Sequence, residues 1–245
     1  MIRNLLSGIV FIFFLSISAS AQEDSSYYSS AIGSGGFAFG FKGGPTIATQ
    51  TWNGFQRNAL FSYHGDAFVE VMGSWKAKGS ISQRSSFLAS LGYHRKGSTF
   101  RNVFYLPSPG VPRIKTPSNL FHNISLGLLG KGAFKIQEKS LAFYGIGITL
   151  DYTLTYQLVG ISTTTGVNRF TYGIWFGGGF EWNLGKSPWA FFVEANINPD
   201  IGRQVFIPAG LPTQFYDSNG IMIPSTQQKV NNLILEISVG FKINK

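Results

Sequence analysis

The chain contains no cysteine. This absence excludes disulfide bonds, catalysis by a thiolate and metal centres with cysteine ligands. It also excludes a lipoprotein, because the lipid of such a protein is attached to a cysteine. No metal ion or other cofactor is expected.

Charged residues are scarce as well. They make up 13% of the chain, about half of the roughly 25% that is usual in a soluble domain. Aromatic residues reach 16%, and there are 30 glycines. Few charges together with many aromatics and glycines favour strands that face lipid on one side and a crowded interior on the other.

After the N-terminus, the sequence has no apolar run that is typical of a membrane helix. At the N-terminus, Arg3 precedes an apolar run over residues 5–17, and Ala19-Ser20-Ala21 matches an A-x-A cleavage site. We therefore predict a cleaved signal peptide over residues 1–21. A Ser/Gly-rich, flexible periplasmic segment is expected over residues 22–36, and a single barrel domain over residues 37–245.

The clearest pattern in the chain is the alternation over residues 144–158, YGIGITLDYTLTYQL. Every second residue is apolar or aromatic and the others are small or polar, which predicts a strand with one apolar face. Strands cross a membrane only in a closed barrel, because an open edge leaves backbone groups unpaired in lipid. With this segment extended to residues 141–158, we predict eight strands, over residues 37–49, 62–75, 81–96, 120–135, 141–158, 169–184, 189–198 and 230–243.

The expected connections alternate in length. Those near residues 76–80, 136–140 and 185–188 are short, and those near residues 50–61, 97–119, 159–168 and 199–229 are longer. Short periplasmic turns and long extracellular loops are typical of outer-membrane barrels. The sequence thus predicts an all-β protein, a single eight-stranded antiparallel transmembrane barrel in a bacterial outer membrane, with both termini in the periplasm.

A soluble, lipocalin-like ligand-binding barrel is the alternative architecture. Such a barrel covers its outside with charge, and the charged fraction of this chain is too small for that. Aromatic residues also mark strand ends, as in Tyr63 with Trp75 and Tyr172 with Trp182, which is typical of the aromatic girdles of membrane barrels.

Three segments resemble a known family. Residues 36–49, GFAFGFKGGPTIAT, resemble the first strand of the PorT-like outer-membrane β-barrel proteins of Bacteroidota-type bacteria. Residues 85–100, SSFLASLGYHRKGSTF, resemble the third strand of that family, which runs into a Tyr-x-x-Lys-Gly turn. Residues 233–245, LILEISVGFKINK, are similar to its last strand. The resemblance implies the barrel class and no particular activity, since most members have none assigned.

The interior of an eight-stranded barrel is just wide enough to be filled by side chains, which argues against a general porin. The alternation predicts that Leu150, Leu154, Ile174 and Leu235 face lipid. It predicts a network of ion pairs in the lumen formed by Asp66, Glu70, Arg84, Lys131, Asp151, Glu181, Glu194 and Glu236, with Lys135 and Lys242 also facing inward. Confined charges have to pair; the alternative role for them is a proton or small-ion path. Gly177-Gly178-Gly179 is expected to mark close packing or a bend in this crowded lumen.

The three histidines are expected near the extracellular rim. His122 shares the apolar face of Ile124, while His64 shares the polar face of Asp66. Their rings therefore point to opposite sides of the sheet, and we do not predict a metal site formed by His64, His94 and His122. Ser62 or a loop serine as nucleophile, with His64 as base and Asp66 as the orienting acid, would permit the chemistry of a lipid A-modifying hydrolase. No motif supports that chemistry, and we predict no catalytic residues.

The strongest local charge signal is a run of cations around the third connection, without an intervening acid. We predict that it contacts lipopolysaccharide phosphates through Arg95, Lys96, Arg101, Arg113 and Lys115. The expected partners are outer-membrane lipids, lipopolysaccharide and the barrel assembly machinery, with no nucleic acid; envelope protein partners are left open. The expected function is non-enzymatic, in a structural, adhesion or secretion/assembly role in the envelope.

Overall fold

The computed structural model describes residues 36–53, 57–78, 81–100, 118–137, 139–158, 166–184, 187–209 and 227–245. The signal peptide predicted over residues 1–21 lies outside the described residues, as does the segment predicted over residues 22–36 except for its last residue. Among the described residues, no helix has the length and apolar character needed to cross a bilayer.

Eight of the strands in the described part of the chain are long, and they correspond to the eight that the sequence predicts. These are β1 (Gly36–Gln50), β2 (Arg57–Met72), β4 (Ile81–Phe100), β5 (Ser118–Gln137), β6 (Ser140–Gln157), β7 (Phe170–Asn183), β8 (Trp189–Pro199) and β11 (Asn232–Asn244). Three are short: β3 (Lys76–Lys78), β9 (Val205–Ile207) and β10 (Gln228–Val230).

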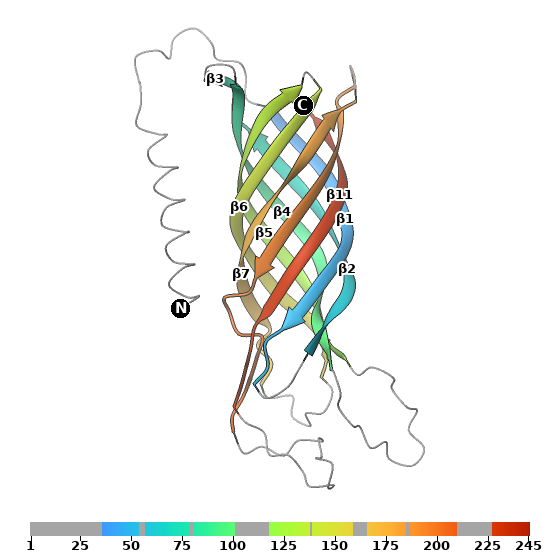
Figure 1. The fold of residues 1–245 in the computed structure, drawn as a ribbon, viewed down its shortest axis with the longest axis vertical. Helices are drawn as coiled ribbons and strands as arrows, with labels where there is room; N and C mark the ends of the chain where they lie inside the picture. Colours follow the sequence, from blue (N-terminus) through green and yellow to red (C-terminus); the bar gives the residue numbers. More distant parts are fainter. Residues whose placement is uncertain are drawn as a thin grey trace. The chain divides into compact units, whose positions relative to one another are not determined.

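The eight long strands close into a barrel (Figure 1). They pair antiparallel in the order β2-β1-β11-β8-β7-β6-β5-β4, and β2 pairs with β4 to complete the circle. The first and last strands are neighbours, with Phe41 opposite Phe241. The circle leaves no long strand with an open edge, which is the condition for strands to cross a membrane. The predicted fold, a closed eight-stranded antiparallel barrel, is confirmed.

The two ends of the barrel differ, and we name them by their connections. The turn end carries the C-terminus and the connections from β2 to β4, from β5 to β6 and from β7 to β8 (Figure 1). The loop end carries the other connections, and there β9 pairs with β10 within the connection from β8 to β11.

Several predicted boundaries are wrong at these ends. At the loop end β2 begins at Arg57, β4 continues to Phe100 and β5 begins at Ser118, because paired strands satisfy their backbone groups beyond the alternating apolar stretch. At the turn end β2 stops at Met72 instead of residue 75. The chain then leaves the ladder at Gly73, whose N–H still donates to Ser85 O, and resumes pairing with β4 as β3.

The outside of the barrel is apolar. Large apolar or aromatic side chains are exposed on every long strand, and among them Leu150 is 47% exposed, Leu154 42% and Leu235 38%. Ile174 is half-buried on the same outer face. An apolar outside around a polar inside is the arrangement of barrels that cross membranes.

The inside of the barrel holds two apolar clusters, with polar layers among and between them. The cluster toward the turn end consists of Phe68, Leu88, Leu129, Ala133, Phe143, Trp175 and Phe192. The cluster at the loop end consists of Trp52, Phe121, Val205, Ile207 and Val230. Phe192 meets Phe68 and Phe143 edge to face, with ring centroids 5.7 and 6.4 Å apart, a favourable aromatic geometry.

Two of the three consecutive glycines of β7, Gly177 and Gly179, make room for this aromatic packing. A Cβ added at Gly177 would lie 2.6 Å from the Trp175 ring, and one added at Gly179 would lie 2.9 Å from Phe143 Cζ. Side chains at these positions would collide with the rings, so the glycines mark close packing in the lumen.

We expect an arginine at the middle of the outer face to destabilise the barrel in lipid. Leu150→Arg places a cation on the outer face of β6 near its centre and should lower the free energy of unfolding by about 2–4 kcal/mol. Phe61→Arg, close to the loop end of β2, should cost about 1 kcal/mol or less because the side chain reaches headgroup depth. Urea unfolding in lipid vesicles measures both. Equal losses from the two variants would contradict the depths in the membrane assigned to Leu150 and Phe61.

Candidate functional site

The lumen, meaning the space enclosed by the eight long strands, holds every carboxylate side chain in the described part of the chain. Alternation along each strand turns these residues inward, and each is at most 7% exposed. They are Asp66, Glu70, Asp151, Glu181, Glu194, Asp200 and Glu236. Buried carboxylates are stable only when they are paired, and four successive layers of the lumen supply the partners.

The layer at the turn end contains two lysines and two glutamates. Lys242 Nζ lies 2.9 Å from Glu70 Oε2 and 2.8 Å from Glu181 Oε2. Lys131 Nζ lies 3.3 Å from Glu70 Oε1 and 3.6 Å from Glu181 Oε2. The Ser86 hydroxyl also donates to Glu70 Oε1 at 2.6 Å. Two positive and two negative charges therefore balance within one buried cluster, which offsets their desolvation.

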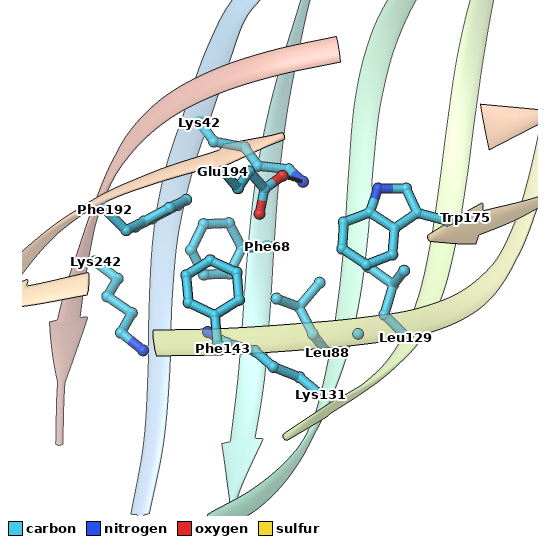
Figure 2. A pocket seen from close by; sticks show the side chains of 11 residues that line it. Lys42, Phe68, Leu88, Leu129, Lys131, Phe143, Trp175, Phe192, Glu194 and Lys242 are labelled. Atoms are coloured by element: carbon cyan, nitrogen blue, oxygen red, sulfur yellow. Dashed lines mark hydrogen bonds and ion pairs between the residues drawn. The ribbon is translucent and has the colours of Figure 1, made fainter. Parts of the chain in front are cut away.

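The second layer is the pair of Lys42 and Glu194. Their side chains form an ion pair, and Lys42 Nζ lies 5.6 Å from the centroid of the Trp175 ring. Figure 2 shows this pair beside the aromatic cluster, with Lys131 and Lys242 also turned toward the same small cavity. The cavity measures about 20 Å³, which is room for a single water molecule.

The third layer is built around two stacked imidazoles. The rings of His64 and His94 lie 5.5 Å apart at an angle of 23°. His94 Nε2 is 2.9 Å from Asp66 Oδ1, and His94 Nδ1 is 2.6 Å from Glu236 Oε1. Carboxylate oxygens accept hydrogen bonds, so a partner on each ring nitrogen favours the doubly protonated, positive form of His94.

The second imidazole has neutral partners. His64 Nε2 lies 2.8 Å from Ser238 Oγ, and His64 Nδ1 lies 3.0 Å from Thr46 Oγ1. A second cavity of about 10 Å³ adjoins this layer and is lined in part by Asp66, His94 and Glu236. It is no larger than a water molecule.

The fourth layer, toward the loop end, is centred on Lys96. Its Nζ donates to Asp151 Oδ2 at 2.6 Å and to Asp200 Oδ1 at 3.1 Å, and Lys96 is fully buried. Asn232 Nδ2 donates to the other oxygen of Asp200 at 2.5 Å. The hydrogen bonds to Lys96 and Asn232 thus hold Asp200, which follows β8, against the inside of the barrel.

Amides close the loop end above this layer. Gln50 Nε2 donates to Asn232 Oδ1 at 2.8 Å, while Ser98 and Trp52 donate to Gln50 Oε1 at 2.8 and 3.1 Å. Gln204 Nε2 donates to Thr153 Oγ1 at 3.0 Å. With the apolar cluster of Trp52, this hydrogen-bonded layer covers the mouth of the lumen.

The structure brings together most of the residues that the sequence predicts for the lumen network. The six predicted carboxylates and Lys131 lie in the layers described above, and Lys242 joins them. Arg84 and Lys135 behave differently. Their cationic groups lie 4.7 and 4.9 Å from the centroid of the Trp75 ring, at the turn end, where the face of this ring replaces a carboxylate as partner.

Sequence reasoning missed four members of the network: Lys42, His94, Lys96 and Asp200. Phe39 and Phe41 face outward, and Lys42 follows Phe41 directly. The alternation along the strand therefore indicates that Lys42 points inward. Asp200 follows Pro199 at the end of β8, and nothing in the local pattern indicates that its carboxylate turns back into the lumen.

The prediction that Lys96 contacts lipopolysaccharide is wrong. Because β4 continues to Phe100, Lys96 lies within the strand and points into the lumen, where two aspartates hold it. Arg95, its neighbour, lies on the outer face with its guanidinium 5.9 Å from the centroid of the Tyr63 ring. Arg101, Arg113 and Lys115 lie outside the described residues.

The placement of His64 and His94 at the rim is also wrong. Since β2 begins at Arg57, His64 lies in the middle of that strand, and both rings are buried inside the barrel. His122 lies on the outer face, where its Nδ1 forms a hydrogen bond with the Tyr93 hydroxyl. Among the described residues, no group of three or more His, Asp or Glu side chains has the arrangement of a metal site.

Comparisons with known proteins concern the barrel as a whole. No protein-family model matches the chain, and no curated protein matches it. Neisserial surface protein A is similar in structure, at 11% identity and a TM-score of 0.39 over 84% of this chain and 96% of that one. The outer membrane protein OprG from Pseudomonas aeruginosa is similar at 11% identity and a TM-score of 0.42, over 87% and 99%. Ail, the attachment invasion locus protein of Yersinia pestis, solved with the heparin analogue sucrose octasulfate, is similar at 10% identity and a TM-score of 0.37, over 85% and 99%.

Proposed function

We propose that the chain is a bacterial outer-membrane protein that acts through its surface, without catalysis or transport, in a structural, adhesion or secretion/assembly role. The observation that carries this proposal is the polarity of the barrel, with paired charges inside and apolar side chains on the outer face of every long strand. A soluble lipocalin-like barrel requires the opposite arrangement, since its outer face meets water.

The two ends of the barrel support an orientation in the membrane. The three longest connections, from β4 to β5, from β6 to β7 and from β8 to β11, are at the loop end, and the C-terminus is at the turn end. In outer-membrane barrels the short turns are periplasmic and the long loops extracellular. We therefore assign the turn end to the periplasm and the loop end to the outside of the cell.

The filled lumen leads us to expect no ion current through the barrel. The cavities of about 20 and 10 Å³ described above have room for no more than a single water molecule each, and hydrated ions need a wider path. Wild-type protein inserted into planar bilayers should leave the membrane insulating at neutral pH. Steady single-channel steps from the purified barrel would contradict this, and would favour the alternative in which the lumen charges form an ion path.

The charge balance of the turn-end layer should be essential for stability. Glu70→Gln leaves Lys131 and Lys242 with Glu181 as their one carboxylate partner, so it should lower the free energy of unfolding by about 3–5 kcal/mol. Lys245→Gln, at an exposed position, should change it by less than about 0.5 kcal/mol. Urea unfolding in vesicles compares the two. If Glu70→Gln were as mild as Lys245→Gln, the ion pairs would be dispensable.

A lipid A-modifying hydrolase is the alternative function. The Ser238–His64 hydrogen bond of 2.8 Å resembles a nucleophile with its base. However, Asp66 bonds to His94 rather than His64, and Thr46 occupies the other nitrogen of His64. Ser238 is fully buried and His64 is 4% exposed, so the lumen offers an acyl chain no route to the hydroxyl.

Lipid A composition tests this alternative in the cell. The chain should sediment with the outer membrane, and mass spectrometry should find the same lipid A species in cells with and without the gene. A change in the acyl pattern that disappears in a Ser238→Ala strain would overturn the non-enzymatic proposal.

A further inference from the structure

The exposed charged side chains of the described part all carry the same sign. All seven carboxylates in the described part are buried in the lumen. The charged side chains that are exposed there are cations: Lys76, Lys135, Lys139, Arg169, Arg203, Lys229 and Lys245. The exposed charged side chains of the described part are thus all positive, which favours an anion from the surroundings.

One outward cation lies within a structured group of side chains. Arg95 of β4 pairs across the ladder with His122 of β5, and on its other side its guanidinium lies 5.9 Å from the centroid of the Tyr63 ring of β2. Tyr93, one outward position below Arg95 on β4, has its ring 6.0 Å from the rings of both Tyr63 and His122. Four polar or aromatic side chains on three adjacent strands therefore form one patch.

The contacts within the patch orient its hydrogen-bonding groups. The Tyr93 hydroxyl engages His122 Nδ1, which leaves His122 Nε2 without a protein partner in the described part. Arg95 Nε is buried and lacks a hydrogen-bond partner there, so the terminal nitrogens of the guanidinium are the donors that a ligand can reach. A guanidinium presents a planar set of donors that fits a phosphate in a bidentate way, and the Tyr63 ring restricts its motion.

The depth of the patch in the membrane indicates which part of a lipid it would contact. An arginine on the outer face of a membrane barrel is costly at the bilayer midplane and nearly neutral at the interface, so Arg95 has to lie at headgroup level. The patch is toward the loop end, and the connection that joins β4 and β5 leaves from there. With the orientation proposed above, that level is the outer leaflet.

We infer that Tyr63, Tyr93, Arg95 and His122 form a binding site for a phosphate group of lipid A in the outer leaflet. The site rests on the proposed outer-membrane location. Arg95 supplies the charge and two donors, while His122, held by Tyr93, supplies a further donor. Tyr63 and Tyr93 pack against the sugar and the upper acyl chains as amphipathic rings.

The test measures lipid A binding to the purified, folded mature chain in detergent, with native mass spectrometry as the readout. Arg95→Gln should weaken binding about tenfold or more, the loss of one charged hydrogen-bonding partner. Arg203→Gln, which removes an exposed arginine elsewhere, is the matched control and should bind like wild type. Tyr93→Phe should weaken binding about two- to threefold because His122 loses its partner.

The choice of probe identifies the ligand. Dephosphorylated lipid A and phosphatidylglycerol should both bind wild type about tenfold more weakly than lipid A. Equal binding by wild type and Arg95→Gln, or by lipid A and its dephosphorylated form, overturns the site. Equal binding of phosphatidylglycerol would assign the patch to phospholipid instead and also overturns it. A failure of the proposed function appears separately, as ion current or an altered acyl pattern, and neither measurement depends on Arg95.

Discussion

Charged side chains that point into the lumen of an eight-stranded barrel need partners there, because the enclosed space is too small to hydrate them. This constraint accounts for the layered lumen. Each lysine of the lumen contacts at least one carboxylate, and His94 lies between two. The pairs join strands that are distant in sequence, such as β2 with β11 through Glu70 and Lys242. A slip of one residue in any ladder would turn these charges into lipid, so the pairing also specifies register.

Apolar packing and ionic pairing divide the lumen between them. The aromatic cluster around Phe143 and Trp175 occupies the half toward the turn end, and the cluster of Trp52 closes the loop end. The charged layers lie among and between these clusters, where the low local dielectric strengthens each correct pair and penalises each missing one. The two cavities described above have room for isolated water molecules. A barrel filled in this way is a rigid support, and its variable part is the surface that it presents at the loop end.

The exposed charges of the described part are all positive, and this gives that surface its character. The carboxylates of the described part face inward, where they balance the lysines of the lumen. The exposed lysines and arginines face the surroundings of the barrel, which favours anionic partners from outside the protein. Arg95 and Lys96 illustrate this with two adjacent residues. One lies over Tyr63 on the outer face, and the other lies fully buried between Asp151 and Asp200. Neighbours along a strand therefore serve different partners, one external and one internal.

The sequence by itself determined the eight long strands, the closed barrel and the inward direction of the six predicted carboxylates. All three follow from the alternation of apolar and polar residues, which is a local pattern that can be seen along each strand. It could not determine which charges meet. His94 pairs with Glu236 across 142 residues, and Lys96 reaches Asp200 through the tilt and stagger of the closed sheet. It also misplaced the strand ends around Lys96 and His64, because backbone pairing continues where the apolar alternation stops. Only the tertiary structure decided those contacts, since partners across a barrel are set by register and closure rather than by neighbouring residues.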